Sequence, residues 1–189
     1  MSKPTPVTTT SATTPVVIST DTSTTPTRLN AFNVRGKIGI ASSHPKVQSG
    51  SAYYAWAQEG DRFAMDITGA LGIGHTVVEY DGVTATLTSE RAGTKTANDP
   101  EVLLAEATGI QAPIAELPYW ISGSHAPSDD RYEADASGRI QQAVNGRWLA
   151  EFSYDSEDLS DTLPSKIKVN YDTQNEHFYR IILTIDHTQ

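Results

Sequence analysis

The sequence predicts a mainly β fold with inserted short helices, of the α+β class. We expect a curled antiparallel sheet of about nine to eleven strands, partly covered by helices on its concave face. Segments of alternating apolar and polar residues, joined by short turns, are typical of such strands. A stretch with helix signals, residues 99–123, separates an earlier set of these segments from a later one. A curled sheet with a partial helical cover can enclose a hydrophobic cavity.

The first set of strands begins at Ala31, where a Ser/Thr/Pro-rich segment ends. Val34, Ile38 and Ile40 alternate with small or charged residues, which predicts a half-buried strand. Turns such as Asp81-Gly82 connect each strand to the next. The predicted strands of this set span residues 34–40, 52–58, 63–68, 77–80 and 83–87.

The middle of the chain predicts short, broken helices. Asp99-Pro100-Glu101 is a helix start, because Asp can cap free N–H groups, proline suits the first helical position and a carboxylate is favourable there. Val102-Leu103-Leu104 would supply the apolar stripe, and Gly109 suits the helix end. A second helical piece is expected from Pro113, restarting at residues 118–121. Its prolines and large aromatic residues indicate packing over an apolar surface.

Strands resume after residue 130. Trp148 and Phe152 share one face of a predicted strand, and Pro164 opens another. The later set is predicted to span residues 131–134, 139–144, 148–154, 164–171 and 179–185.

The domain organisation follows from composition. Residues 1–29 are mostly Ser, Thr and Pro, so they bury too little apolar surface to offset the entropy of ordering them. We expect a disordered segment there, which is either a tether to an anchor or a plain unstructured end. Residues 30–189 are expected to form one domain.

Charge and cysteine content exclude several classes of function. The formal net charge is -9, which argues against nucleic-acid binding and predicts that any membrane contact is apolar, because anionic lipid repels such a chain. The sequence contains no cysteine, so it offers no disulfide, zinc–thiolate site or thiol for lipid attachment. No apolar run reaches membrane-spanning length.

The sequence predicts neither a metal nor a cofactor, and no enzyme. Its five histidines do not lie at metal-ligand spacing, and no phosphate-binding or nucleophile motif is present. The acidic run Asp155 to Asp161 is interpreted as a solvated hairpin turn, and Asp129-Asp130 as another turn. A hydrolase that uses two isolated carboxylates stays open as an alternative.

A glycine-rich loop between two predicted strands carries an unusual apolar residue. Hairpin tips normally carry polar residues or glycine because they face water. Leu71 either folds back onto the domain or projects as an apolar probe for a membrane or a protein. The candidate loop residues are Gly69, Ala70, Leu71, Gly72 and Ile73.

Several short motifs occur in an order that resembles a known family. The likeness covers nearly all of the chain from Phe32 onward and includes the strand that Pro164 opens, and each motif is weak alone. The motifs are Val34-Arg35-Gly36, Trp56-Ala57-Gln58-Glu59-Gly60, Gly69-Ala70-Leu71-Gly72, Asp99-Pro100-Glu101-Val102-Leu103-Leu104, Thr108-Gly109-Ile110-Gln111-Ala112-Pro113, Leu117-Pro118-Tyr119-Trp120-Ile121-Ser122-Gly123 and Gly138-Arg139. Together they resemble the outer-membrane lipoprotein receptor LolB family of Gram-negative bacteria.

The resemblance implies a curved antiparallel half-barrel with a helical lid over a hydrophobic cavity. The cavity would hold the acyl chains of lipoproteins received from the periplasmic carrier LolA, and the loop would help to insert them into the inner leaflet of the outer membrane. The expected cavity residues are Ile38, Ile40, Tyr54, Trp56, Phe63, Met65, Leu103, Leu104, Trp120, Ile121, Trp148 and Phe152.

The resemblance also implies a monomer on the periplasmic face of the outer membrane, anchored by a lipidated N-terminal cysteine. That cysteine is missing, so we expect that the sequence begins just after it. Ala70 and His187 also depart from the family pattern, which often has proline and tryptophan near these positions. The alternatives are a binding module of the same fold for another lipid or apolar ligand, and the hydrolase.

Overall fold

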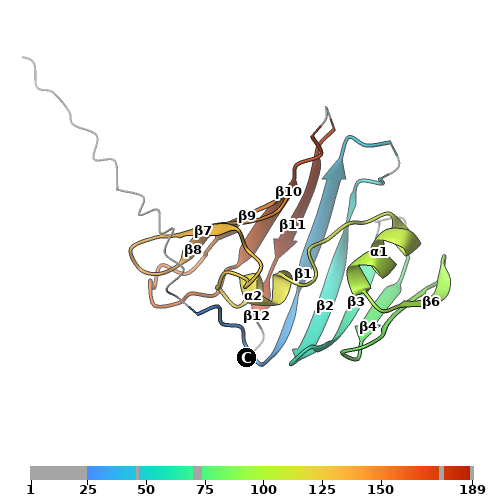
Figure 1. The fold of residues 1–189 in the computed structure, drawn as a ribbon, viewed down its shortest axis with the longest axis horizontal. Helices are drawn as coiled ribbons and strands as arrows, with labels where there is room; N and C mark the ends of the chain where they lie inside the picture. Colours follow the sequence, from blue (N-terminus) through green and yellow to red (C-terminus); the bar gives the residue numbers. More distant parts are fainter. Residues whose placement is uncertain (1–24, 46, 70–73, 175–176, 188–189) are drawn as a thin grey trace, which may run out of the picture.

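The computed structural model describes residues 25–45, 47–69, 74–174 and 177–187, and Figure 1 shows the fold. These residues form one antiparallel sheet of twelve strands in the order β6-β5-β4-β3-β2-β1-β11-β10-β9-β8-β7, with β12 paired to β1. The strands are β1 (Ala31–Ser42), β2 (Gly50–Glu59), β3 (Arg62–Gly69), β4 (Thr76–Tyr80), β5 (Ala85–Ser89), β6 (Gly93–Ala97), β7 (Arg131–Ala134), β8 (Ile140–Asn145), β9 (Trp148–Ser153), β10 (Lys166–Tyr171), β11 (Tyr179–Thr184) and β12 (Asp186–His187).

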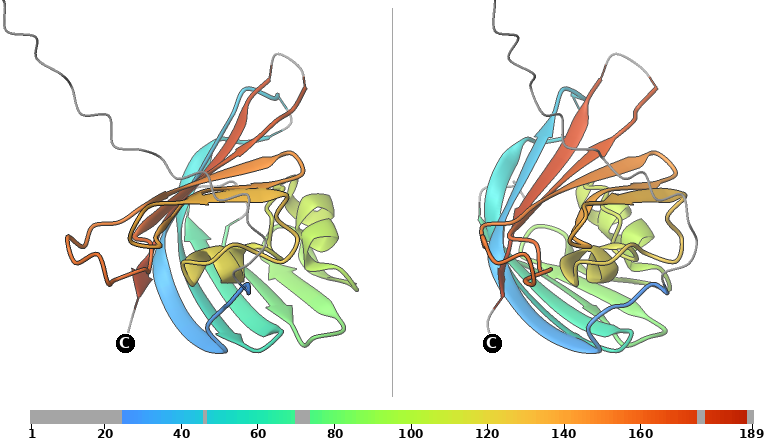
Figure 2. Two further views of the ribbon diagram at one scale, coloured as in Figure 1. Left: turned by 60° about the vertical axis from the view of Figure 1, so that its left-hand side comes forward. Right: turned by 90° about the vertical axis from the view of Figure 1, so that its left-hand side faces the viewer.

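The sheet is open and curved. β6 and β7 form its two edges, and Figure 2 shows it curling around the helices. The mainly β architecture with few helices is therefore confirmed, but twelve strands exceed the nine to eleven predicted. The difference is β6, whose exposed sequence Gly93–Ala97 lacks apolar alternation, and β12, a two-residue continuation beyond Ile185.

The pleat separates an inner from an outer face. In β2, Ala52, Tyr54 and Trp56 are buried beneath the helices, whereas Tyr53 is exposed on the outside. The indole N–H of Trp56 donates to Gln58 Oε1 at 3.1 Å, which satisfies a polar side chain that this pattern buries. The predicted strand 83–87 begins only at Ala85. The Asp81 carboxylate accepts from the backbone N–H groups of Val83 and Thr84, and these hydrogen bonds turn the chain before the strand starts.

The first helix, α1 (Pro100–Thr108), begins and ends as predicted. Asp99 Oδ1 accepts from the N–H groups of Glu101 and Val102, and Gly109 ends the helix in the left-handed conformation. Leu103 and Leu104 are buried against the sheet. Val102 does not belong to the predicted apolar stripe, since it lies on the solvent side of the helix and is 47% exposed.

The second helix, α2 (Leu117–Ile121), starts four residues later than predicted. Residues 113–116 form a turn instead, and Pro118 lies in the first turn of α2, where its missing N–H leaves no helical bond unmade. Trp120 is fully buried, packs edge-on against Phe152, and donates its indole N–H to Asp129 Oδ2 at 3.0 Å. Asp129, predicted to sit in a turn, thus also fixes α2.

The acidic run between β9 and β10 is exposed, but it is part of a long connection rather than a tight hairpin turn. The buried Arg139 guanidinium donates to the backbone carbonyls of Ser156, Asp158 and Asp161, and it lies 4.8 Å from the centre of the Tyr154 ring. The connection is therefore shaped by its carbonyl groups turning inward to one arginine.

The chain enters the sheet through contacts with the loop after α2. The backbone N–H groups of Thr27 and Leu29 donate to Ser124 and Ser122, and Arg28 pairs with Asp61. Residues 1–24 of the predicted tether lie outside the described residues, and its function stays a prediction.

Gly36 permits β1 and the end of β11 to approach closely. A Cβ atom at this position would lie 1.8 Å from the backbone oxygen of Thr184, whereas at Gly39, on the same strand, the nearest such atom is 4.0 Å away. β1 pairs with β11 on one side of this crossing and with β12 on the other. The glycine is therefore required by backbone contact rather than by an unusual φ angle.

We expect Gly36→Ala to destabilise the domain by about 1–3 kcal/mol, because the strands must separate to admit the methyl group. Urea unfolding followed by circular dichroism measures the change. Gly39→Ala is the matched control and should be neutral or slightly stabilising. Equal stability of the two variants would contradict the close approach.

Candidate functional site

The inner face of the sheet carries a narrow apolar hollow. It is bounded by β1, β2, β3, β10 and β11 on one side, and by α1 and residues 110–117 on the other. About 30 Å³ is open to the centres of water-sized spheres, roughly the room that one or two water molecules need. The wall consists of Ile38, Ile40, Tyr54, Trp56, Met65, Ile67, Leu104, Ile110, Ala112, Pro113, Ile114, Leu117, Val169, Ile181 and Leu183.

Half of the expected cavity residues line this hollow. These are Ile38, Ile40, Tyr54, Trp56, Met65 and Leu104. The others lie in the surrounding core: Phe63 packs between Trp56 and Tyr80, Trp148 contacts Tyr171 and Tyr179, and Leu103, Trp120, Ile121 and Phe152 are buried elsewhere.

Two groups of wall residues were missed from the sequence. Ile67, Val169, Ile181 and Leu183 follow the same alternation as the predicted strand residues of the wall. The last three are placed on the inner face by the pairing of β11 with β1 and β10. Ile110, Ala112 and Ile114 belong to a segment without a regular period, so no pattern predicts which side they face.

Residues 110–117, which we call the strap, close the hollow. The Tyr179 hydroxyl both accepts from the N–H of Gln111 at 3.1 Å and donates to its carbonyl at 2.7 Å. Burial raises the pKa of Tyr179 to about 12, so the hydroxyl keeps its proton at neutral pH. One side chain of β11 therefore fixes the start of the strap.

Two carboxylates fix the rest of the strap. Glu101 Oε1 on α1 accepts from the N–H of Ala115 at 2.9 Å, and burial raises the pKa of Glu101. Glu116 accepts from Ser128 Oγ at 2.9 Å and from Asn145 Nδ2 at 3.2 Å. The strap thus rests on apolar contacts to the sheet and on a small number of hydrogen bonds.

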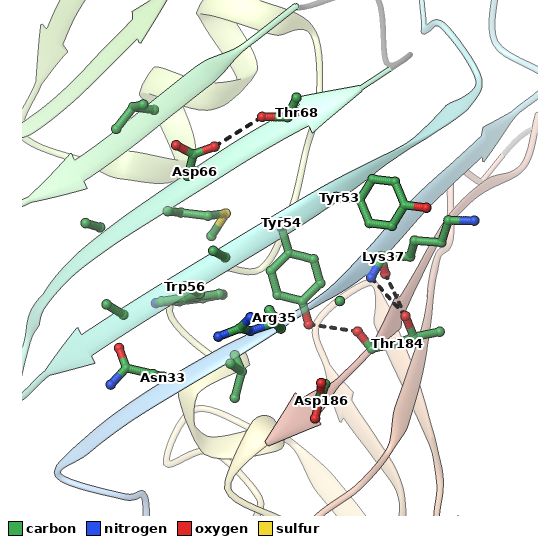
Figure 3. Close-up of a pocket in the computed structure, with 17 residues that line it drawn as sticks. Asn33, Arg35, Lys37, Tyr53, Tyr54, Trp56, Asp66, Thr68, Thr184 and Asp186 are labelled. Carbon is green, nitrogen blue, oxygen red and sulfur yellow. Dashed lines mark hydrogen bonds between the residues drawn. The ribbon is translucent and has the colours of Figure 1, made fainter. Parts of the chain in front are cut away.

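A second, larger hollow lies on the outer face, over β1, β2 and β3, and measures about 1030 Å³ (Figure 3). Small side chains such as Ala55, Ala57 and Ala64 make part of its lining. Its charged residues are two cations and two carboxylates: Arg35, Lys37, Asp66 and Asp186. It is wide and open, unlike the hollow on the inner face.

The candidate transfer loop lies only partly in the described chain. Ala70, Leu71, Gly72 and Ile73 lie outside the described residues. Gly69 ends β3 opposite Ala52 and has a φ of 149°, where a side chain would meet the Ala52 backbone. The base of the loop is thus set by backbone packing.

An ion pair lies beside this loop base. His75 Nε2 is 2.9 Å from Asp66 Oδ2, and both side chains are about half exposed. The hydrogen bond to Asp66, and then its charge, raise the pKa of His75.

The described residues hold neither a metal-binding cluster nor a membrane-spanning helix. Within the described ranges, no three His, Asp or Glu side chains gather where they could hold a metal ion. Nor does that part of the chain include a helix with the length and apolar character needed to span a bilayer.

The fold defines a class of protein: an open antiparallel sheet whose apolar inner face is covered by short helices and a strap. The family model described as "Outer membrane lipoprotein LolB" matches residues 30–187. The chain therefore belongs to the LolB family of outer membrane lipoproteins.

Two sequence relatives carry the name of the same family. The outer-membrane lipoprotein LolB of Pseudomonas fluorescens is 31% identical over 145 residues, covering 76% of this chain and 69% of that protein. The LolB protein of Francisella tularensis subsp. tularensis is 29% identical over 147 residues, covering 77% of this chain and 70% of that protein. A crystal structure of a LolA superfamily protein from Nitrosomonas europaea, 8% identical, gives a TM-score of 0.48 and covers 86% of this chain and 89% of that one.

The His75–Asp66 pair predicts a pH dependence. We expect NMR titration to give a His75 pKa above the ordinary value of 6.5, and Asp66→Asn to lower it toward that value. The raised pKa means that the pair stabilises the fold below pH 6.5 and that this contribution is lost as pH rises through the raised value. A His75 pKa that is the same with and without Asp66 would contradict the pairing.

Proposed function

We propose that the chain is a receptor that accepts acylated lipoproteins from a LolA-like periplasmic carrier and inserts them into the outer membrane. The observation that carries the proposal is the wholly apolar hollow beneath a strap in a chain of the LolB family. In this proposal the strap and the short helices act as the lid, and the curved sheet acts as the half-barrel.

Energetics explain why such a site is needed. Burying one CH₂ group contributes about 0.8 kcal/mol, so exposing an acyl chain of some fifteen such groups to water costs on the order of 12 kcal/mol. A cavity that offers an apolar wall lowers this cost during transfer between carrier and membrane. Passing the chain from one apolar surface to another requires no covalent step, and the proposed activity is therefore non-enzymatic.

The hollow must enlarge to receive an acyl chain. Its present space is far below the volume of such a chain, so we propose that the strap moves away from β10 and β11. The acyl chain would then take the place of the Ile110, Ile114 and Leu117 side chains against the sheet. One set of apolar contacts would thus be exchanged for another. The hydrogen bonds lost contribute about 1 kcal/mol each, which the buried acyl chain exceeds.

The loop and the anchor complete the proposal. Leu71, flanked by Gly69, Ala70, Gly72 and Ile73, would enter the inner leaflet of the outer membrane as the cargo leaves. Residues 1–29 would serve as the tether of a monomeric protein on the periplasmic face of that membrane. A lipidated cysteine before the tether would anchor it there.

A second candidate is a binding module for another lipid or apolar ligand. The wall of the hollow is apolar throughout, so it can recognise an alkyl chain but not the protein attached to it. Competition between a fluorescent fatty acid and an acylated lipoprotein separates the two. Preference for the acylated lipoprotein supports the receptor, and equal or weaker binding of the lipoprotein favours the module.

Loosening the strap should speed uptake of an acyl probe. Tyr179→Phe removes both hydrogen bonds to Gln111 but leaves the ring in place, so we expect association to accelerate about three- to tenfold. Stopped-flow fluorescence with a fluorescent fatty acid measures the rate. Tyr171→Phe, at the position paired with Tyr179 on β10, is the control and should leave the rate unchanged. A Tyr179→Phe rate equal to that of the control would show that the strap does not limit entry.

A charge at the loop tip should block insertion without affecting folding or cargo binding. We expect Leu71→Glu to keep the unfolding midpoint and cargo binding of the parent chain, but to reduce transfer of a lipoprotein into vesicles at least tenfold, because a carboxylate resists entering lipid. Leu159→Glu, at a leucine that is 60% exposed in the connection between β9 and β10, is the matched control. Normal transfer by Leu71→Glu would remove the loop from the proposal.

A further inference from the structure

The outer face of the sheet separates charge in a way that the net charge conceals. β1, β10, β11 and β12 carry six charged residues, and all of them point away from the inner face. Five are cations and one is a carboxylate, in a chain whose formal net charge is -9. These six residues form what we call the basic face: Arg35, Lys37, Lys166, Lys168, Arg180 and Asp186.

The strand register places these cations side by side. Thr184 is paired with Lys166 on β10, and its hydroxyl accepts from the backbone N–H of Lys37 on β1 at 2.9 Å. The two lysines therefore flank one residue of β11, about 10 Å apart across two strand spacings. In the next row, Ile182 is paired with Lys168. The cations thus cover a continuous area over three neighbouring strands.

Exposed apolar groups lie among these cations. Ile182 is 36% exposed on β11, and Tyr53, which is 65% exposed on β2, packs its ring 5.4 Å from the Lys37 ammonium. Long cationic side chains around exposed apolar residues are typical of surfaces that lie in the headgroup region of a bilayer. The outer hollow of Figure 3 adjoins this area through Arg35, Lys37 and Tyr53.

Carboxylates gather on the other side of the molecule. α1 and its cap carry Asp99, Glu101 and Glu106, and the strap carries Glu116. At the border of the basic face, Glu151 pairs with Lys168 at 2.7 Å and Asp66 pairs with His75. The area over β1, β10, β11 and β12 is therefore positive, whereas α1 and the strap carry carboxylates. An anionic surface would orient the molecule with this positive area toward it.

We propose that the basic face binds the anionic phospholipid headgroups of a membrane. This goes beyond the proposed function, because it requires neither the hollow nor cargo. The net charge alone predicted that anionic lipid repels the chain, and the proposal modifies that expectation. Charges on the far side of the molecule are screened over about 8 Å at physiological salt, whereas the cations of the basic face would touch the lipid. A membrane fits better than an acidic protein, since three of the five cations are lysines, which are depleted at protein–protein interfaces.

Vesicle sedimentation tests the proposal with the chain of residues 1–189. We expect binding to vesicles of phosphatidylglycerol and phosphatidylcholine in equal amounts, weakening as salt is raised, and little binding to phosphatidylcholine alone. The double variant Lys37→Gln with Lys166→Gln should lose roughly ten- to thirtyfold in partitioning. The control Lys95→Gln with Arg131→Gln removes the same charge from the edge strands β6 and β7 and should lose less than threefold.

Each of the following results would overturn the proposal. They are absence of binding to the anionic vesicles, equal binding to both kinds of vesicle, and equal losses in the two double variants. Normal vesicle binding by Lys37→Gln with Lys166→Gln, combined with impaired cargo handover from a carrier, would assign the surface to a protein instead. Uptake of an acyl probe without vesicles should be unchanged in this variant, so failure of this proposal is distinct from failure of the proposed function.

Discussion

The structure depends on the pleat of β1, β2, β10 and β11, which separates an apolar face of the sheet from a more polar one. Alternate residues of these strands face opposite sides, so apolar side chains collect inside, and the charged side chains of β1, β10 and β11 lie outside. The sheet does not close on itself, because β6 and β7 are its free edges. Its inner face is therefore covered by α1, α2 and the strap, and not by a second sheet. Both the hollow and the basic face are consequences of this alternation.

The strap relates the stability of the fold to the function proposed for it. An apolar inner face left open to water would be unfavourable, and the strap covers it with Ile110, Ile114 and Leu117. Few hydrogen bonds hold the strap backbone in place: Tyr179 binds it at Gln111, and Glu101 binds it at Ala115. In the proposed function, such a cover would protect the face in the absence of cargo, and an acyl chain would displace it at low cost.

The sequence predicted the elements that have local signals and not those set by tertiary contacts. The limits of α1 followed from Asp99 and Gly109, because capping is a local interaction. β6 was missed because an exposed edge strand needs no apolar alternation. Half of the residues expected in a cavity line the hollow, because most of them lie on strands that follow a period of two. The strap faces inward because of Tyr179, which lies 68 residues from Gln111. The basic face was missed because net charge does not record how strands on either side of β11 are paired.

The central claim is that an acyl chain displaces the strap and occupies the inner face. A crystal structure with a triacylated lipopeptide tests it most directly. The account predicts acyl carbons in contact with Ile38, Met65 and Ile181, with the hydrogen bonds between Tyr179 and Gln111 broken. A lipopeptide bound elsewhere, with the strap still seated on the sheet, would contradict it.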